Sequence, residues 1–201
     1  MTVATLDRVA TALGARVSVR LLWQGELLDR LRDEAHAAIV EQVLAVLVAS
    51  RWLAATEVSF SVFGERGSID VLAFHAETGA LLVVEVKSVV PDVQATLVTL
   101  DRKERLAKGI AAERGWTARS VGRLLVIRDL RTARRRVGAH ALTFGNAFPD
   151  RGWEVRRWLA APDVTRPLRG LWFLPGGSQA GTRRGLRRSP GRIVRGVQRE
   201  S

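Results

Sequence analysis

The sequence has no cysteine, no long apolar run and none of the common nucleotide-binding or hydrolase motifs. The absence of cysteine among 201 residues excludes disulfides and a zinc site built on thiolates. The first residues lack the apolar core of a secretory signal, and no apolar segment approaches the roughly 20 residues that span a membrane. No internal repeat, P-loop, dinucleotide-binding glycine string or Ser/His/Asp arrangement is present. We therefore expect a cytoplasmic protein that does not act at a membrane.

Lysine is also scarce, although the chain is strongly basic. Of 32 lysine and arginine residues, only three are lysine, and these are Lys87, Lys103 and Lys108. The compact ammonium of lysine and the planar guanidinium of arginine are not equivalent in a catalytic site. The lysine at position 87 therefore marks its own segment as a candidate site.

Residues 67–87 have the pattern of a β-hairpin. Two apolar runs rich in β-branched residues flank residues 76–79, a four-residue turn with glycine at its exit. Across such a turn, His75 would face Ala80, and this pair fixes the register of both strands. The two strands are apolar on both faces, which is typical of buried rather than solvent-exposed strands.

This register brings two carboxylates and an ammonium together. Asp70 lies opposite Glu85, with their Cβ atoms about 5 Å apart, and Lys87 projects from the same face as Glu85 because side chains alternate along a strand. Like charges directly opposed on neighbouring strands are destabilising, so a cation is expected between the two acids. The arrangement predicts a hard-cation site that activates water against a phosphodiester. The alternative is a salt bridge on an edge strand.

The motif Ile69-Asp70, followed by Glu85-Val86-Lys87, resembles the PD-(D/E)xK nuclease superfamily over about residues 34 to 145. Ile69 stands where the family pattern has proline. The resemblance implies a three-layer, restriction-endonuclease-like α/β domain with a mixed central sheet flanked by helices. It also implies that Asp70, Glu85 and the Val86 carbonyl hold Mg²⁺, or alternatively Mn²⁺, and that Lys87 orients the attacking water.

The same resemblance suggests two further catalytic candidates. In the superfamily, the first core helix often supplies another carboxylate, and Glu41 is the best-placed match, with Glu34 and His36 as competitors. Gln94 matches a glutamine that follows the catalytic lysine in some subfamilies. The alternative for Glu41 is an ordinary exposed glutamate on a helix.

Apolar spacing outlines the other elements of the domain. Three- and four-residue intervals predict a long helix over 27–52, with a break near Asp33 as one alternative. Alternation predicts a strand over 57–63, and Pro91-Asp92 marks the start of a helix over 93–114. A buried strand over 121–128 follows, and its crossover implies a parallel addition to the antiparallel hairpin. A helix is expected over 134–148, and residues 153–159 and 170–174 close the domain.

The charge distribution suggests a polyanionic partner. The formal charge of +12 and the pI near 11.6 suit DNA binding. Arginines are clustered near the start of the helix over 134–148, where their positive charge interacts unfavourably with the helix dipole unless anions bind there. Solvated surface charge is the alternative for these residues. The expected phosphate contacts are Arg102, Lys103, Arg131, Arg134, Arg135 and Arg136.

The chain divides into three parts. Residues 1–25 contain a short helix ending before Gly14, which resembles the last helix of an XRE-type helix-turn-helix regulator whose earlier helices are missing; an ordinary docking helix is the alternative. Residues 26–175 form the nuclease-like domain. Residues 176–201 form a basic tail expected to be disordered, either an electrostatic arm on DNA or a solvated terminus.

Taken together, these features predict a metal-dependent DNA endonuclease or a nuclease-like DNA-processing protein, and they allow a homodimer. The alternative is a non-catalytic, DNA-binding transcriptional regulator of the XRE type that uses a nuclease-like fold as a platform. A third hypothesis is an interaction module of a toxin–antitoxin or phage-defence system. The intact set of Asp70, Glu85 and Lys87 favours the enzyme.

Overall fold

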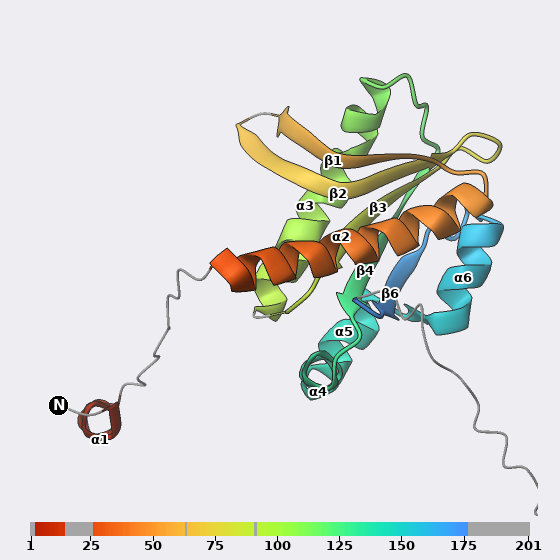
Figure 1. Cartoon of the computed structure of the whole chain (residues 1–201). Helices are drawn as coiled ribbons and strands as arrows, with labels where there is room; N and C mark the ends of the chain where they lie inside the picture. Colours follow the sequence, from red (N-terminus) through yellow and green to blue (C-terminus); the bar gives the residue numbers. More distant parts are fainter. Residues whose placement is uncertain (1–2, 15–25, 63, 91, 177–201) are drawn as a thin grey trace, which may run out of the picture.

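The computed structural model describes residues 3–14, 26–62, 64–90 and 92–176, which form a mixed α/β domain preceded by one short helix. The six strands form one sheet in the order β1-β2-β3-β4-β6-β5, antiparallel from β1 to β3 and parallel from β3 to β5, which confirms the mixed sheet predicted from the sequence (Figure 1). The elements are α1 (Val3–Ala12), α2 (Glu26–Ala49), β1 (Leu53–Val62), β2 (Glu65–His75), β3 (Ala80–Lys87), α3 (Val93–Ala112), β4 (Ser120–Arg128), α4 (Arg131–Ala139), α5 (Ala141–Ala147), β5 (Asp150–Arg151), α6 (Gly152–Ala160) and β6 (Arg169–Leu174).

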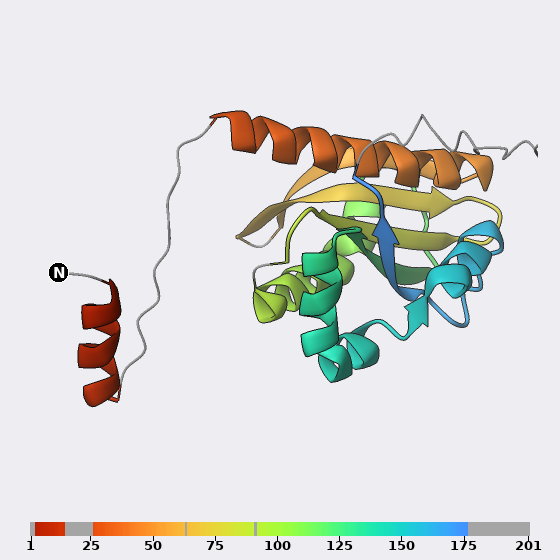
Figure 2. The same cartoon turned by 60° about the horizontal axis from the view of Figure 1, so that its bottom comes forward.

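Helices cover both faces of the sheet, so the domain has three layers. Figure 2 shows α2 on one side of the sheet and α4 and α5 on the other. The core between α2, α6 and the sheet contains Ile39, Val43, Val71, Leu82 and Leu159. The core on the opposite face is built from α3, α4 and α5, and it includes Leu72, Leu81, Leu100, Ile110, Leu125 and Phe144. Burial of both faces explains why β3 and β4 are nearly continuous apolar runs.

The hairpin has the predicted register. His75 pairs with Ala80, and the antiparallel ladder continues to the pair Val71 and Val84. Gly79 has a φ of 75°, a left-handed conformation that residues with a side chain rarely adopt. The turn residues therefore determine which side chains meet at the far end of the hairpin, where the candidate site lies.

Several element boundaries differ from the sequence prediction. Helix α2 runs unbroken through Asp33 and stops at Ala49, and Arg51, with a φ of 61°, turns the chain into a strand that starts at Leu53 rather than at Glu57. The helix expected over 134–148 is two helices, which meet at His140, where φ is −120° and ψ is 36°.

The structure describes only part of the two segments predicted at the ends of the chain. Helix α1 ends before Gly14, as expected, and Gly14 has a φ of 69°. Residues 15–25 and all of the predicted basic tail (176–201) except Gly176 lie outside the described residues. Within the described ranges, no helix is both long enough and apolar enough to cross a membrane.

Candidate functional site

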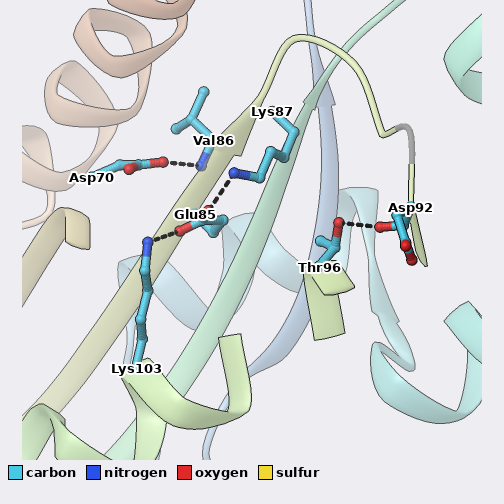
Figure 3. A network of polar contacts seen from close by, with 7 residues as sticks. All are labelled: Asp70, Glu85, Val86, Lys87, Asp92, Thr96 and Lys103. Atoms are coloured by element: carbon cyan, nitrogen blue, oxygen red, sulfur yellow. Dashed lines mark hydrogen bonds and ion pairs between the residues drawn. The ribbon is translucent and has the colours of Figure 1, made fainter. Parts of the chain in front are cut away.

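Asp70 lies where β2 and β3 begin to separate. The backbone ladder ends one pair earlier, at Val71 and Val84, and the Val86 amide instead donates to Oδ2 of Asp70 at 2.6 Å (Figure 3). The carboxylate thus replaces a backbone acceptor and is fixed against β3 beside Glu85. The hairpin brings the two predicted acids to one place.

The pairing of Asp70 is also interrupted on its other side. On β1, Thr56 pairs with Val71 and Val58 pairs with Ile69, but Glu57, which this register sets opposite Asp70, leaves the ladder with a φ of 49°. A left-handed conformation costs a residue with a side chain about 1–2 kcal/mol. Strain of this kind persists where the surrounding structure imposes it, often beside functional groups. Sequence reasoning missed this feature because Glu57 is neither glycine nor asparagine.

Glu85 is the buried centre of the site. Its side chain is 2% exposed, and each of its oxygens contacts a lysine. Lys87 Nζ lies 2.6 Å from Oε1, and Lys103 Nζ contacts Oε2. Figure 3 shows the two ammonium groups approaching the carboxylate from two sides, Lys87 from the same strand and Lys103 from α3.

Lys103, predicted as a phosphate contact or a solvated charge, is buried in the structure. Its side chain is 6% exposed, because it occupies the buried face of α3 together with Leu100, Ala107 and Ile110. Two sequence signals mark it: its spacing along that apolar face, and the scarcity of lysine, since two of the three lysines contact Glu85.

A second ion-pair group anchors α3 against the sheet. Arg123 of β4 is buried and contacts both Asp101 and Glu104, with the second contact at 3.1 Å. These two acids flank Lys103 on both sides along the helix. Arg123 of β4 therefore fixes the position of α3 on the sheet, and with it the position of the Lys103 ammonium.

The environment of Asp70 disfavours its charged form. Burial raises the pKa of the Asp70 carboxyl above its ordinary value, and the negative charge of Glu85 raises it further. The Val86 amide, the charge of Lys103 and that of His36 act in the opposite direction. A cation placed between the two acids would relieve this repulsion.

Glu41 does not lie at the site, contrary to the prediction. From Asp33 onward, the buried positions of α2 are Ala35, Ile39, Val43 and Leu47, and at 3.6 residues per turn Glu41 points about 180° away from their centre. Its side chain is exposed, as is that of Glu34. His36 lies only about 40° from the buried direction, and it is the α2 residue whose charge acts on Asp70.

Gln94 lies in the first turn of α3 and is exposed. The start of this helix is fixed by Asp92, whose side chain accepts the Ala95 amide at 3.0 Å. Its backbone carbonyl accepts the Thr96 hydroxyl at 2.6 Å (Figure 3). No hydrogen bond or ion pair within the described part of the chain connects Gln94 with Glu85. Its predicted role in orienting water or substrate stays a prediction.

The four predicted phosphate contacts on α4 are all exposed. Arg134 is bound to Asp129 through two hydrogen bonds of 2.6 and 2.9 Å and lies over the ring of Phe173. This pairing holds the pKa of Asp129 below its ordinary value. Arg131, Arg135 and Arg136 are exposed on the same helix, whereas Arg102 on α3 is half-buried. The four arginines of α4 therefore present positive charge at the surface.

The donors of the site fit one hard cation. No cluster of three or more His, Cys, Asp and Glu side chains suited to a metal occurs within the described ranges. Asp70 and Glu85 nevertheless provide two carboxylates, which hard divalent cations prefer, and the Val86 carbonyl is adjacent in sequence. Lys87, whose side chain is 35% exposed, has room to move away from Glu85.

Comparison of the sequence with protein-family models and with curated proteins finds no match.

Proposed function

We propose that this protein is a metal-dependent nuclease that hydrolyses phosphodiesters in DNA. The observation that carries the proposal is the meeting of two carboxylates and an ammonium at the separating ends of β2 and β3. Asp70 is held there by the Val86 amide at 2.6 Å, and Lys87 lies 2.6 Å from Glu85. The raised pKa of Asp70, caused by burial and by Glu85, supports a cation as the ligand of the two acids.

Each residue then has a separate task. Asp70 and Glu85, with the Val86 carbonyl, would hold Mg²⁺, which when bound supplies a polarised water and stabilises charge on the phosphoryl oxygens. The ammonium of Lys87 is exposed enough to face a substrate and would orient the water and offset negative charge as it develops. The buried backbone around Glu85 keeps these groups in one geometry before substrate arrives.

The surface beside Lys87 suits a phosphate backbone. Residues 88–90 follow Lys87 directly and line a hollow of about 230 Å³ together with Thr132, Ala133 and Arg136 of α4. The exposed Arg131 and Arg135 lie on the same helix. Arginine contacts to phosphate position a duplex without reading its sequence, so DNA binding should be weakly sequence-specific.

A non-catalytic DNA-binding platform is the second candidate, and one observation favours it. Both oxygens of Glu85 are already paired with lysines, so its charge is balanced without any metal ion. A regulator that kept the fold and lost catalysis would need nothing more at this position. Metal binding and cleavage distinguish the two candidates.

The test is nicking of supercoiled plasmid by the wild type and by Asp70→Asn, each with Mg²⁺, with Mn²⁺ and with a chelator. Asn keeps an oxygen that can accept the Val86 amide, so the hairpin should keep its geometry while the charge is lost. Metal-dependent nicking by the wild type alone supports the nuclease. DNA binding without nicking by either protein, across duplex, junction and single-stranded substrates, supports the platform.

A further inference from the structure

Lys103 is a buried cation whose ion pair among the described residues is with Glu85. Its side chain is 6% exposed and that of Glu85 is 2% exposed. Removing one member of such a pair leaves the other charge buried and uncompensated, which is strongly destabilising. Lys103 is therefore not free to exchange Glu85 for water or for a substrate.

The two lysines on Glu85 differ in this respect. Lys87 is 35% exposed and lies at the end of β3, so its ammonium can move into solvent. Lys103 extends from the buried face of α3, whose register is fixed by Arg123 through Asp101 and Glu104. The contact of Lys87 with Oε1 of Glu85 can therefore be exchanged for another ligand, whereas Lys103 stays paired with Oε2.

We propose that Lys103 takes the place of a second divalent ion, so that the site binds one metal ion and Lys87 is the lysine that moves aside for it. This inference rests on the proposed metal-dependent function. In two-metal sites, carboxylates are shared between two ions about 3.5–4 Å apart. Here the Oε2 side of Glu85 already carries a fixed positive charge, which repels a second ion.

Lys103 acts through Glu85 and is a positioning residue. Its burial keeps it from touching a substrate directly. Its positive charge, held against Oε2 of Glu85, reduces the net negative charge that a metal ion meets.

The experiment measures Mn²⁺ binding to the full chain by isothermal titration calorimetry, with Lys103→Met as the main variant. The matched control is Lys108→Met on the same helix, because Lys108 is exposed and donates to the Arg119 carbonyl at 3.2 Å rather than to an acid. We expect one ion per chain for the wild type and for Lys108→Met. Lys103→Met should bind the first ion at least about tenfold more tightly, because a repelling unit charge is gone.

Lys103→Gln provides a second variant in case the methionine variant does not fold. Its amide can still donate to Glu85 but carries no charge, so it should also bind Mn²⁺ more tightly than the wild type. Cleavage should fall in both variants despite the tighter binding, an outcome that simple loss of structure does not produce.

The outcomes separate this inference from the function on which it rests. A wild type that binds no Mn²⁺ overturns the metal site itself. A wild type that binds two ions per chain, or Lys103 variants whose affinity equals that of Lys108→Met, overturns the role of Lys103 and leaves the proposed nuclease intact.

Discussion

Adding Mg²⁺ should stabilise the folded chain by an amount that rises with the logarithm of the metal concentration. The reason is that Asp70 and Glu85 are held together only in the folded state, where burial and mutual repulsion raise the pKa of Asp70. The unfolded chain separates these two residues, which lie on different strands, and has no matching site. Any ligand that binds only the folded state stabilises it by mass action.

The size of the effect follows from the number of ions bound. Once the metal concentration exceeds the dissociation constant, each tenfold increase adds about 1.4 kcal/mol per ion to the free energy of unfolding. For a chain of 201 residues, this corresponds to a rise of about 3–6 °C in Tm per tenfold increase in metal. Two ions would double that slope.

The assay is thermal unfolding of the wild type and of Asp70→Asn at several Mg²⁺ concentrations, with NaCl added to keep the ionic strength constant. The salt control matters because the chain carries a formal charge of +12 and responds to screening alone. Asp70→Asn should show no dependence on Mg²⁺. Equal slopes for the two proteins would refute the assignment of the metal to Asp70.

Three further predictions concern pH, DNA binding and the hairpin turn. The pKa of Asp70 is raised above its ordinary 3.8 in the folded state, so the metal-free fold loses stability as the pH rises through that raised value. In urea titrations, Asp70→Asn should therefore gain stability relative to the wild type between acid and neutral pH. A difference in unfolding free energy between the two proteins that stays constant with pH would contradict this. The double variant Arg131→Gln/Arg135→Gln should reduce the slope of log affinity for duplex DNA against log salt concentration by about 2, whereas Arg134→Gln, whose guanidinium Asp129 already binds, should change it less. Gly79→Ala should lower the free energy of unfolding by about 1–2 kcal/mol, because φ is 75° there and a Cβ would lie 2.7 Å from Cγ of Arg119; an unchanged urea midpoint would show that the turn relaxes freely.

The sequence predicted the hairpin and its acids because local chemistry determines both. A turn ending in Gly79 pairs His75 with Ala80, and the register of this hairpin then places Asp70 beside Glu85. No contact between distant parts of the chain is needed to predict this. The mixed sheet was predicted from a single crossover, in which β3 is followed by helix α3 and the parallel strand β4. The hairpin depends on residues close together in the sequence, and the crossover depends on the single helix α3 between β3 and β4.

Features that depend on packing between distant elements were missed or misplaced. The spacing of Lys103 along the apolar face of α3 marks it as buried, but its contact with Glu85 depends on how α3 packs against the sheet. Glu41 was chosen by likeness to a family, although the spacing of the apolar residues in the same helix already placed it on the outer face. The strain at Glu57 has no glycine or proline to mark it, and the helix break at His140 was missed although Gly138 precedes it by two residues.

The most direct test of the central claim compares cleavage with binding in Lys87→Ala. If Lys87 stabilises charge that develops during hydrolysis, it contributes to the transition state far more than to DNA binding. With Mg²⁺ present, Lys87→Ala should therefore nick plasmid about 100-fold or more slowly than the wild type, while shifting the mobility of the same DNA equally well. Arginine at this position should rescue poorly, because a planar guanidinium cannot replace a compact ammonium beside Glu85. Equal nicking rates for wild type and Lys87→Ala, or binding without cleavage by both, would contradict catalysis at this site.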